Sequence, residues 1–185
     1  LIGVDAARVT PGASAAIALG IGACLTGCDQ QRIEALPNTA DMPNEVILQR
    51  GHHYKYDRCV ELAGARLVEV GDTEGTRPEE IRAAIGPRTA ALFVPAHLDG
   101  QNGTVSLADV AAIGHEQGIP TFVDAAYMNY PVEIMGSFNA QGADLVCFSA
   151  KYFGGPNAAG FLSGRRDLIA AVAAIDFTRH AGDSA

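Results

Sequence analysis

The stretch ADLVCFSAKYFGGPNAAGFLSGRRDL, residues 143–168, holds the strongest clue to the fold of this chain. Within it an apolar run from Leu145 to Phe148 ends in a serine and, two residues later, in Lys151. A glycine-rich turn follows, and a second apolar run at 159–163 comes directly after it. Lys151 is one of only two lysines in a chain with eleven arginines. Because lysine is seldom buried without a partner, a lysine at the end of a buried strand suggests a chemical role.

Short β-rich runs alternate with amphipathic stretches along the rest of the chain. This alternation predicts a three-layer α/β/α domain, in which helices cover both faces of a mostly parallel, seven-stranded sheet. The last two strands have no helix between them, so we expect that pair to be antiparallel. The expected strands are 7–10, 45–49, 67–70, 90–95, 120–124, 144–148 and 159–163. The expected helices are 13–27, 54–63, 78–86, 106–117 and 165–176.

Composition narrows the possible partners and the compartment. The 185 residues carry a net charge of −8, and 48% of them are hydrophobic. An acidic chain is poorly suited to nucleic acid, and no apolar run reaches the roughly 18 residues that a membrane span needs. No signal peptide is recognisable, so we expect a cytoplasmic protein. The four cysteines are interpreted as buried, reduced thiols, with a zinc site or a disulfide as the alternatives: Cys24, Cys28, Cys59 and Cys147.

Reactive side chains follow several of the predicted strands, where parallel α/β sheets bind ligands. The first strand leads into TPGAS, residues 10–14, and a glycine turn at a helix start suits a phosphate, although such turns are common. The second leads to His52 and His53, which could equally be surface or packing residues. The fifth ends in Asp124, a carboxylate that we expect to be buried and to need a cation, from a ligand or from a structural salt bridge. The sixth leads to Lys151.

Pyridoxal phosphate needs this combination of groups. Its phosphate suits a helix N-terminus, its pyridine nitrogen suits a carboxylate that keeps it protonated, and its aldehyde forms a Schiff base with a lysine. We therefore predict that Asp124 and Lys151 face a common cavity. Lys55 lies in a polar stretch at a helix start and is the weaker candidate. The alternative interpretation of Lys151 is a surface lysine whose ammonium reaches solvent.

The chain also resembles a known superfamily. VTPGASAA, VILQRGHHYKYD, FVDAA and ADLVCFSAKYFGGPNAAGFLSGRRDLI follow one another in the order seen in the fold-type I pyridoxal-phosphate enzymes. Within that superfamily, GARLVEVGD and QGADLVCFSAKYFGGP are similar to the group around bacterial selenocysteine synthase and the D-glucosaminate-6-phosphate ammonia-lyases. Family members are considerably longer. The resemblance therefore implies that residues 1–185 are the cofactor-binding large domain without an N-terminal arm and a small C-terminal domain, either as part of a longer enzyme or as a reduced homologue.

The resemblance also implies a role for each matching residue around the cofactor ring. Lys151 carries the Schiff base and moves a proton at the substrate's α-carbon, and Asp124 pairs with the pyridine nitrogen. His52 stacks on the ring, with His53 as the fallback. A residue of segment 96–104 approaches the cofactor's phenolic oxygen, but the sequence does not show which one.

For the phosphate end, the resemblance implies that Gly12, Ala13 and Ser14 bind the phosphate through the start of the first helix. Ser149 adds a hydroxyl to the same group. No metal ligands are expected.

The function that the resemblance implies is a pyridoxal-phosphate-dependent enzyme that acts on an amino acid or an amino sugar acid. A lyase that removes ammonia after abstraction of the α-proton is the first hypothesis. An aminotransferase or racemase of the same fold is the alternative, and so is a truncated, non-catalytic homologue. We expect a small-molecule substrate and a homodimer or larger homo-oligomer, with neither nucleic acid nor membrane as a partner.

Overall fold

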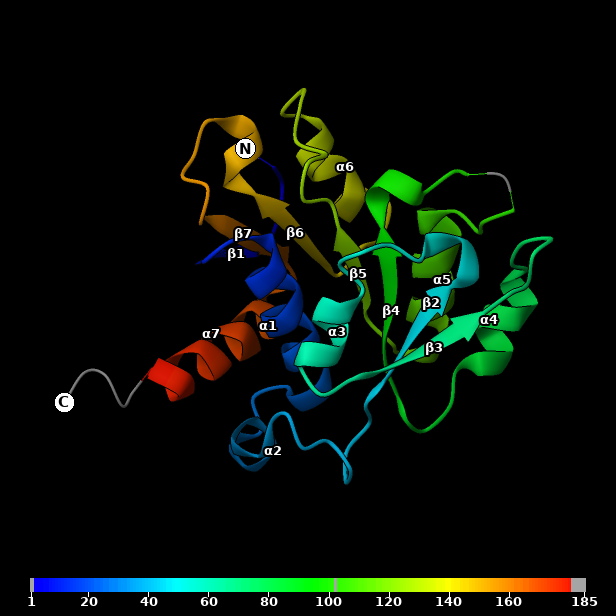
Figure 1. Cartoon of the computed structure of the whole chain (residues 1–185), viewed down its shortest axis with the longest axis horizontal. Helices are drawn as coiled ribbons and strands as arrows, with labels where there is room; N and C mark the ends of the chain where they lie inside the picture. Colours follow the sequence, from blue (N-terminus) through cyan, green and yellow to red (C-terminus); the bar gives the residue numbers. More distant parts are fainter. Residues whose placement is uncertain (1, 102, 181–185) are drawn as a thin grey trace.

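A seven-stranded sheet runs through the middle of the protein in the order β1-β7-β6-β5-β4-β2-β3 (Figure 1). A computed structural model of the chain describes residues 2–101 and 103–180. The strands are β1 (Ala6–Thr10), β2 (Glu45–Gln49), β3 (Arg66–Val70), β4 (Thr89–Pro95), β5 (Thr121–Asp124), β6 (Leu145–Ser149) and β7 (Gly160–Gly164). The seven predicted strands are therefore confirmed, and their bounds lie close to the predicted ones.

Strand direction brings the ends of most strands to one edge of the sheet. The strands from β2 to β6 pair in parallel, and β6 and β7 pair antiparallel as predicted. β7 also pairs antiparallel with β1. Two reversals leave β1 running in the same direction as β6. The carboxyl end of β1 at Thr10 therefore lies at the same edge as Asp124 and Ser149, which end β5 and β6.

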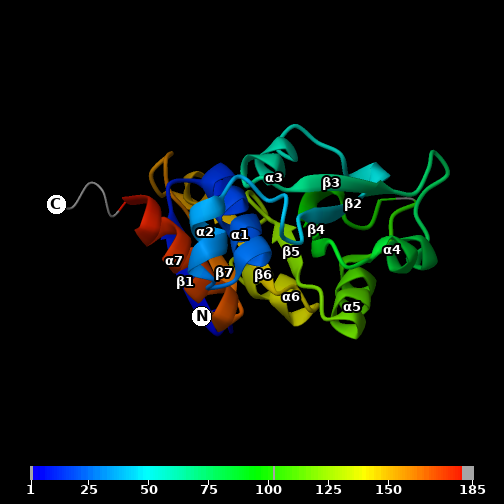
Figure 2. The ribbon, with the colours of Figure 1, turned by 90° about the horizontal axis from the view of Figure 1, so that it is seen from below.

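Helices cover both faces of the sheet, which confirms the predicted three layers (Figure 2). One face carries α1 (Ala13–Thr26), α2 (Gln30–Ala35), α3 (Arg58–Leu62) and α7 (Arg166–His180). The other carries α4 (Pro78–Ala84), α5 (Leu107–Gln117) and α6 (Ile134–Ala140). Short 3₁₀ turns follow three of the strands: η1 (Arg50–His52), η2 (Ala96–Leu98) and η3 (Ala150–Phe153). Among the described residues, no helix has the length and apolar character needed to cross a bilayer.

Two differences from the predicted helices have local causes. The helix predicted at 54–63 begins only at Arg58, because the residues before it form a turn that carries Tyr54 and Tyr56 to the edge of the sheet. The helices α2 and α6 were not predicted. Both are shorter than two full turns, and such segments hold too few apolar positions for a helical period to be recognised.

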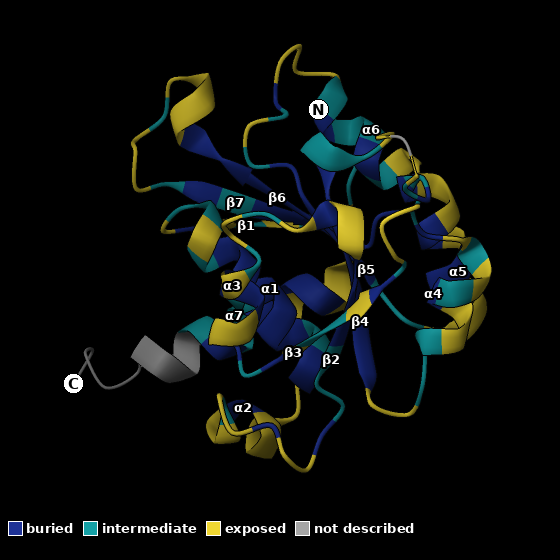
Figure 3. Cartoon of the chain, turned by 45° about the vertical axis from the view of Figure 1, so that its right-hand side comes forward, coloured by how far each residue is buried: buried dark blue, intermediate teal, exposed yellow. Residues whose placement is uncertain are grey.

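Close packing between α1 and β5 fixes where α1 begins. The central strands are buried between the two layers of helices (Figure 3). Phe122 of β5 is fully buried, and a Cβ on Gly20 of α1 would lie 2.2 Å from its ring. Only glycine lets the helix approach the strand so closely. This approach sets the position of the helix N-terminus relative to the carboxyl end of β5.

Replacing Gly20 by alanine tests this packing. The added methyl group would overlap the Phe122 ring, so helix or ring must shift. We expect the free energy of unfolding, measured by urea denaturation, to fall by about 1–3 kcal/mol.

Gly22→Ala in the same helix is the control, because its Cβ would lie 3.3 Å from the flexible end of Ile175. Alanine also gains about 0.5–1 kcal/mol of helix propensity over glycine, so this variant is expected to be neutral or slightly stabilised. An equal loss in the two variants would contradict the close contact at Gly20.

Candidate active site

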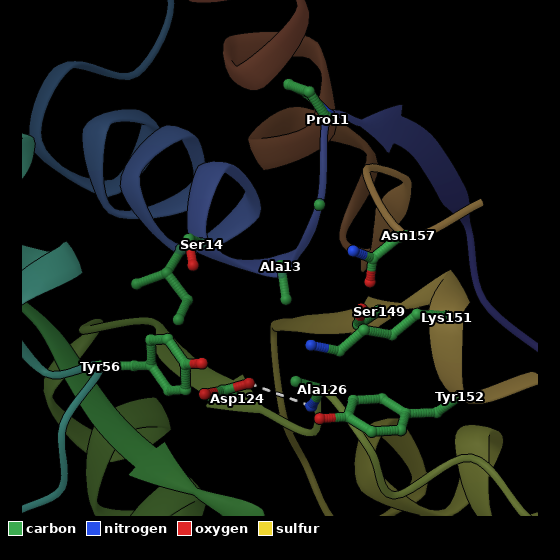
Figure 4. Close-up of a pocket in the computed structure, with 12 residues that line it drawn as sticks. Pro11, Ala13, Ser14, Tyr56, Asp124, Ala126, Ser149, Lys151, Tyr152 and Asn157 are labelled. Atoms are coloured by element: carbon green, nitrogen blue, oxygen red, sulfur yellow. Dashed lines mark hydrogen bonds between the residues drawn. The ribbon is translucent and has the colours of Figure 1, made fainter. Parts of the chain in front are cut away.

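Six of the residues singled out from the sequence meet at one cavity of about 200 Å³ at this edge of the sheet (Figure 4). They are Gly12, Ala13, Ser14, Asp124, Ser149 and Lys151. They come from the start of α1 just after β1, from the last residues of β5 and β6, and from η3, so strand direction gathers them from distant parts of the chain. The lining is completed by Pro11, Ile17, Tyr56, Ala126, Tyr152 and Asn157.

The N-terminus of α1 opens into this first cavity. Gly12 is the N-cap residue and has a φ of 95°, a backbone conformation that favours glycine. No side chain among the described residues caps the helix. The N–H groups of the first turn therefore stay available, and the positive end of the helix dipole adds to them. This wall of the cavity suits an anion such as a phosphate.

Asp124 lines the opposite wall and is only 3% exposed. Its Oδ1 accepts hydrogen bonds from the N–H of Ala126 at 3.0 Å and from the thiol of Cys147 at 3.2 Å. Its Oδ2 accepts a hydrogen bond from the hydroxyl of Tyr54. The predicted burial is confirmed. A structural salt bridge is not its partner, because all three of these donors are neutral and no cation of the described residues forms an ion pair with it.

Contact with Asp124 changes the acidity of its two side-chain donors. The pKa of the Tyr54 phenol is raised, first by burial and then by the nearby charge of Asp124. Burial and the same carboxylate raise the pKa of the Cys147 thiol well above its ordinary value. Both groups therefore keep their protons at neutral pH and remain hydrogen-bond donors, and Asp124 remains the acceptor.

Lys151 enters the cavity from η3, the turn that follows β6. Figure 4 shows its amine directed into the cavity, between the first turn of α1 and the segment that carries Asp124 and Ala126. Its Nζ lies 4.9 Å from the centroid of the Tyr152 ring. The residue as a whole is exposed, so a small molecule can reach the amine from solvent. Lys151 and Asp124 therefore face a common cavity, as predicted.

A second cavity of about 320 Å³ adjoins the first. The two share Tyr56, Asp124, Ala126 and Tyr152, and the second is completed by Tyr54, Lys55, His97, Tyr127 and Met128. Its walls are largely aromatic. The His97 ring lies 5.1 Å from that of Tyr54 and 5.4 Å from that of Tyr127. These contacts give the second cavity a continuous aromatic surface beside the first cavity.

The structure places the predicted ring-stacking histidine elsewhere. His52 is fully buried in η1, burial lowers its pKa, and it lines neither cavity. The stacking role predicted for His52 therefore finds no support in this geometry. From segment 96–104, His97 lines the second cavity, whereas Asn102 lies outside the described residues.

His53, the predicted fallback, binds two carboxylates instead of lining a cavity. Its Nδ1 lies 2.7 Å from Asp57 Oδ2, and its Nε2 lies 2.7 Å from Glu69 Oε2. Only a protonated imidazole donates from both nitrogens, and its pKa is raised, chiefly by the hydrogen bond with Asp57. Tyr54 and Tyr56, which reach the cavities, lie in the turn between His53 and Asp57. The contact of His53 with Asp57 closes this turn, and its contact with Glu69 attaches the turn to β3.

The side-chain partners of Asp124 were missed in the sequence. Cys147 lies beside Asp124 on the neighbouring strand, but a cysteine within an apolar run gives no sign of such a contact. Tyr54 and Tyr56 fell inside a predicted helix. The available signal was the alternation of histidine, tyrosine and lysine in HHYKY directly after a strand.

The four cysteines are free thiols. Cys59 and Cys147 are buried, Cys24 is half-buried and Cys28 is exposed, so the predicted burial is wrong for Cys28. Within residues 2–101 and 103–180 there is no group of three histidine, cysteine or acidic side chains placed to hold a metal ion.

Comparison with solved structures identifies the class to which this fold belongs. A D-glucosaminate-6-phosphate ammonia-lyase is 35% identical with a TM-score of 0.86, covering 94% of this chain and 47% of that one. An aspartate aminotransferase variant from Thermus thermophilus is 24% identical with a TM-score of 0.62, covering 93% and 47%, and shares the fold alone. The domain has the large-domain fold of the fold-type I pyridoxal-phosphate enzymes.

Sequence comparison identifies the family. The model of the family described as SelA, L-seryl-tRNA selenium transferase, matches residues 39–181, and the chain belongs to this family. A 5'-C-glycyluridine monooxygenase-decarboxylase from Streptomyces is 39% identical over 175 residues, which cover 90% of this chain and 42% of that protein. A D-glucosaminate-6-phosphate ammonia lyase from Salmonella typhimurium is 35% identical over 175 residues, covering 91% and 46%. The chain spans less than half the length of these relatives.

The contact of His53 with two carboxylates predicts a pH-dependent stability. A pKa raised by folding contributes stability below the unfolded value of about 6.5, and this contribution is lost as pH rises through the folded value. The His53 side chain is 41% exposed, so solvent screening limits the effect to less than about 1 kcal/mol. We expect the free energy of unfolding of wild type relative to His53→Gln to decline from mildly acidic to alkaline pH. Parallel pH profiles for the two proteins would contradict a protonated His53.

Proposed function

We propose that the first cavity binds pyridoxal phosphate and that the whole protein is an enzyme that uses this cofactor on an amino acid or an amino sugar acid. The observation that supports this most is the state of Asp124. It is a buried carboxylate whose partners among the described residues are all neutral donors. Burial of a charge is costly unless an opposite charge meets it, and a protonated pyridine nitrogen supplies that charge.

The hydrogen bonds of Asp124 leave room for this contact. An ionised carboxylate offers about four acceptor positions. Three are used, by the Tyr54 hydroxyl, the Cys147 thiol and the Ala126 N–H. One acceptor position of Asp124 is therefore free, and Asp124 lines the same cavity as Lys151. This arrangement fits a ring that carries a cationic N–H on one side and an aldehyde on the other.

The rest of the first cavity fits the other parts of the cofactor. The first turn of α1 would hold the phosphate through Gly12, Ala13 and Ser14, and Ser149 adds a hydroxyl beside them. Tyr56 and Ala126 line the cavity next to Asp124 and offer a flat and a small surface to a ring. Tyr56 thus takes the stacking role that the sequence had suggested for His52. His97 is our candidate for the contact with the phenolic oxygen.

The proposed chemistry takes place at the substrate's α-carbon. When bound, pyridoxal phosphate supplies an electron sink for the negative charge that develops there. Lys151 would hold the cofactor, and its amine would take the α-proton as a general base. Asp124 would hold a proton at the ring nitrogen, and Tyr54 and Cys147 fix the direction of its carboxylate. The first turn of α1 keeps the phosphate end in place.

Within this chemistry, a lyase that eliminates ammonia is our first choice. Support comes from the ammonia lyase of Salmonella typhimurium among the relatives and from the fold match to an ammonia-lyase. Transamination and racemisation would use the same residues of this chain. A non-catalytic role would require that the shared cavity of Lys151 and Asp124 binds no cofactor.

The proposal extends to partners and compartment. Tyr127, Tyr130, Tyr152 and Phe153 are large, exposed side chains in the segments that carry the two cavities, which supports a homodimer or larger homo-oligomer that covers them. The net charge of −8 supports a small-molecule substrate and disfavours RNA, and we propose a cytoplasmic location.

Reduction with borohydride tests the cofactor site. Protein mixed with pyridoxal phosphate is expected to absorb visible light, and borohydride is expected to fix the cofactor on Lys151. Lys151→Ala is expected to lose both the covalent label and the visible band, because no other amine lines the first cavity among the described residues. Peptide mass spectrometry identifies the labelled residue.

Lys55→Ala is the matched control, because Lys55 is the only other lysine of the chain. This variant is expected to keep the label on Lys151. A colourless wild type, or a label found on Lys55, would refute the proposed role of Lys151.

A further inference from the structure

Among the described residues, most arginines of this chain have a carboxylate partner, and its two lysines do not. Eight arginines form ion pairs with carboxylates in the part of the chain that the structure describes. Neither lysine does so. Each ammonium lies beside a tyrosine ring instead: Lys55 at 4.8 Å from the centroid of Tyr56, and Lys151 at 4.9 Å from that of Tyr152. In a chain with an excess of acids, two cations without a carboxylate partner, each facing a cavity, are available to an anionic ligand.

Lys55 supplies the positive charge of the second cavity. Of the other groups that line it, His97 is neutral at neutral pH because burial lowers its pKa, and the Tyr54 phenol keeps its proton. Asp124 is engaged by its three donors. Lys55 is thus the one cation among the described residues that line the second cavity.

The second cavity lies where the far end of a substrate would extend. It shares Tyr56 and Tyr152 with the cavity that holds the Lys151 amine, so a molecule bound near that amine can reach across the shared wall. The aromatic surface made by Tyr54, His97 and Tyr127 suits the carbon skeleton of such a molecule. Lys55 then faces the end that is remote from the reacting carbon.

We propose that the second cavity binds the remote end of the substrate and that Lys55 selects substrates in which this end carries an anion, either a carboxylate or a phosphate ester. This inference rests on the proposed function of the first cavity. Lys55 acts by binding and takes no part in bond making or breaking. The ammonium would move from its contact with Tyr56 to a charge-assisted hydrogen bond with the anion.

Matched ligand pairs that differ only in the remote charge test the inference. The cofactor-loaded protein is titrated with O-phosphoserine and serine, with glutamate and glutamine, and with D-glucosaminate with and without its 6-phosphate. Binding is followed by the change in the visible spectrum of the cofactor. In at least one pair we expect the anionic ligand to bind about tenfold more tightly or better, as a charge-assisted hydrogen bond allows. Comparison of the phosphate pairs with the carboxylate pair shows which of the two anions the second cavity prefers.

Variants of Lys55 decide whether it is the source of this preference. Lys55→Met is expected to remove the preference and to keep the cofactor spectrum, whereas Lys55→Arg is expected to retain it. Arg82→Met, on α4 and away from both cavities, is expected to behave as wild type.

Equal binding of charged and neutral ligands by wild type, or a preference that survives in Lys55→Met, would overturn the inference while the cofactor spectrum still supports the proposed function. A wild-type protein without that spectrum would overturn both.

Discussion

A buried carboxylate that has only neutral partners among the described residues is the constraint on which the site depends. The Asp124 carboxylate is stabilised in its buried position at the end of β5 by hydrogen bonds from Tyr54, Ala126 and Cys147. Cys147 is set beside it by the register of β5 and β6, and Tyr54 is held by its ring, which stacks on Phe93 at 6.4 Å. Removal of a charge from water costs several kcal/mol unless such contacts compensate for it. The strand register and the packing of Tyr54 on Phe93 therefore also position the hydrogen-bond donors of Asp124.

The direction of the strands explains why these groups share one edge. Because β1 is antiparallel to β7 and β7 to β6, the turn after β1 lies at the carboxyl end of the parallel strands. The uncapped start of α1 is thereby placed across the cavity from Asp124, and η3 brings Lys151 between them. Each wall offers a different chemistry: backbone N–H groups, an amine and a carboxylate. A ligand with three distinct ends is what such a cavity can orient.

Much of the fold and about half of the site could be predicted from the sequence. Strand positions follow from apolar runs, and Asp124 and Lys151 follow from their places at strand ends, because both signals are local. His52 illustrates the limit: the resemblance implied that it stacks on the cofactor ring, but the 3₁₀ turn that follows β2 buries it completely. Cys147 could not be recognised, because its contact with Asp124 forms only in the folded chain. Tyr54 and Tyr56 were assigned to a helix, although the HHYKY pattern after a strand offered a weak signal of their place at the cavities.

The protonation state of the cofactor's ring nitrogen tests the central claim most directly. The protein can be loaded with pyridoxal phosphate that carries ¹⁵N in the ring, and the nitrogen chemical shift then reports whether a proton is bound. A carboxylate that has one acceptor position left for a cation is expected to keep this nitrogen protonated at neutral pH and in mild alkali. A shift typical of an unprotonated pyridine would show that Asp124 has another purpose.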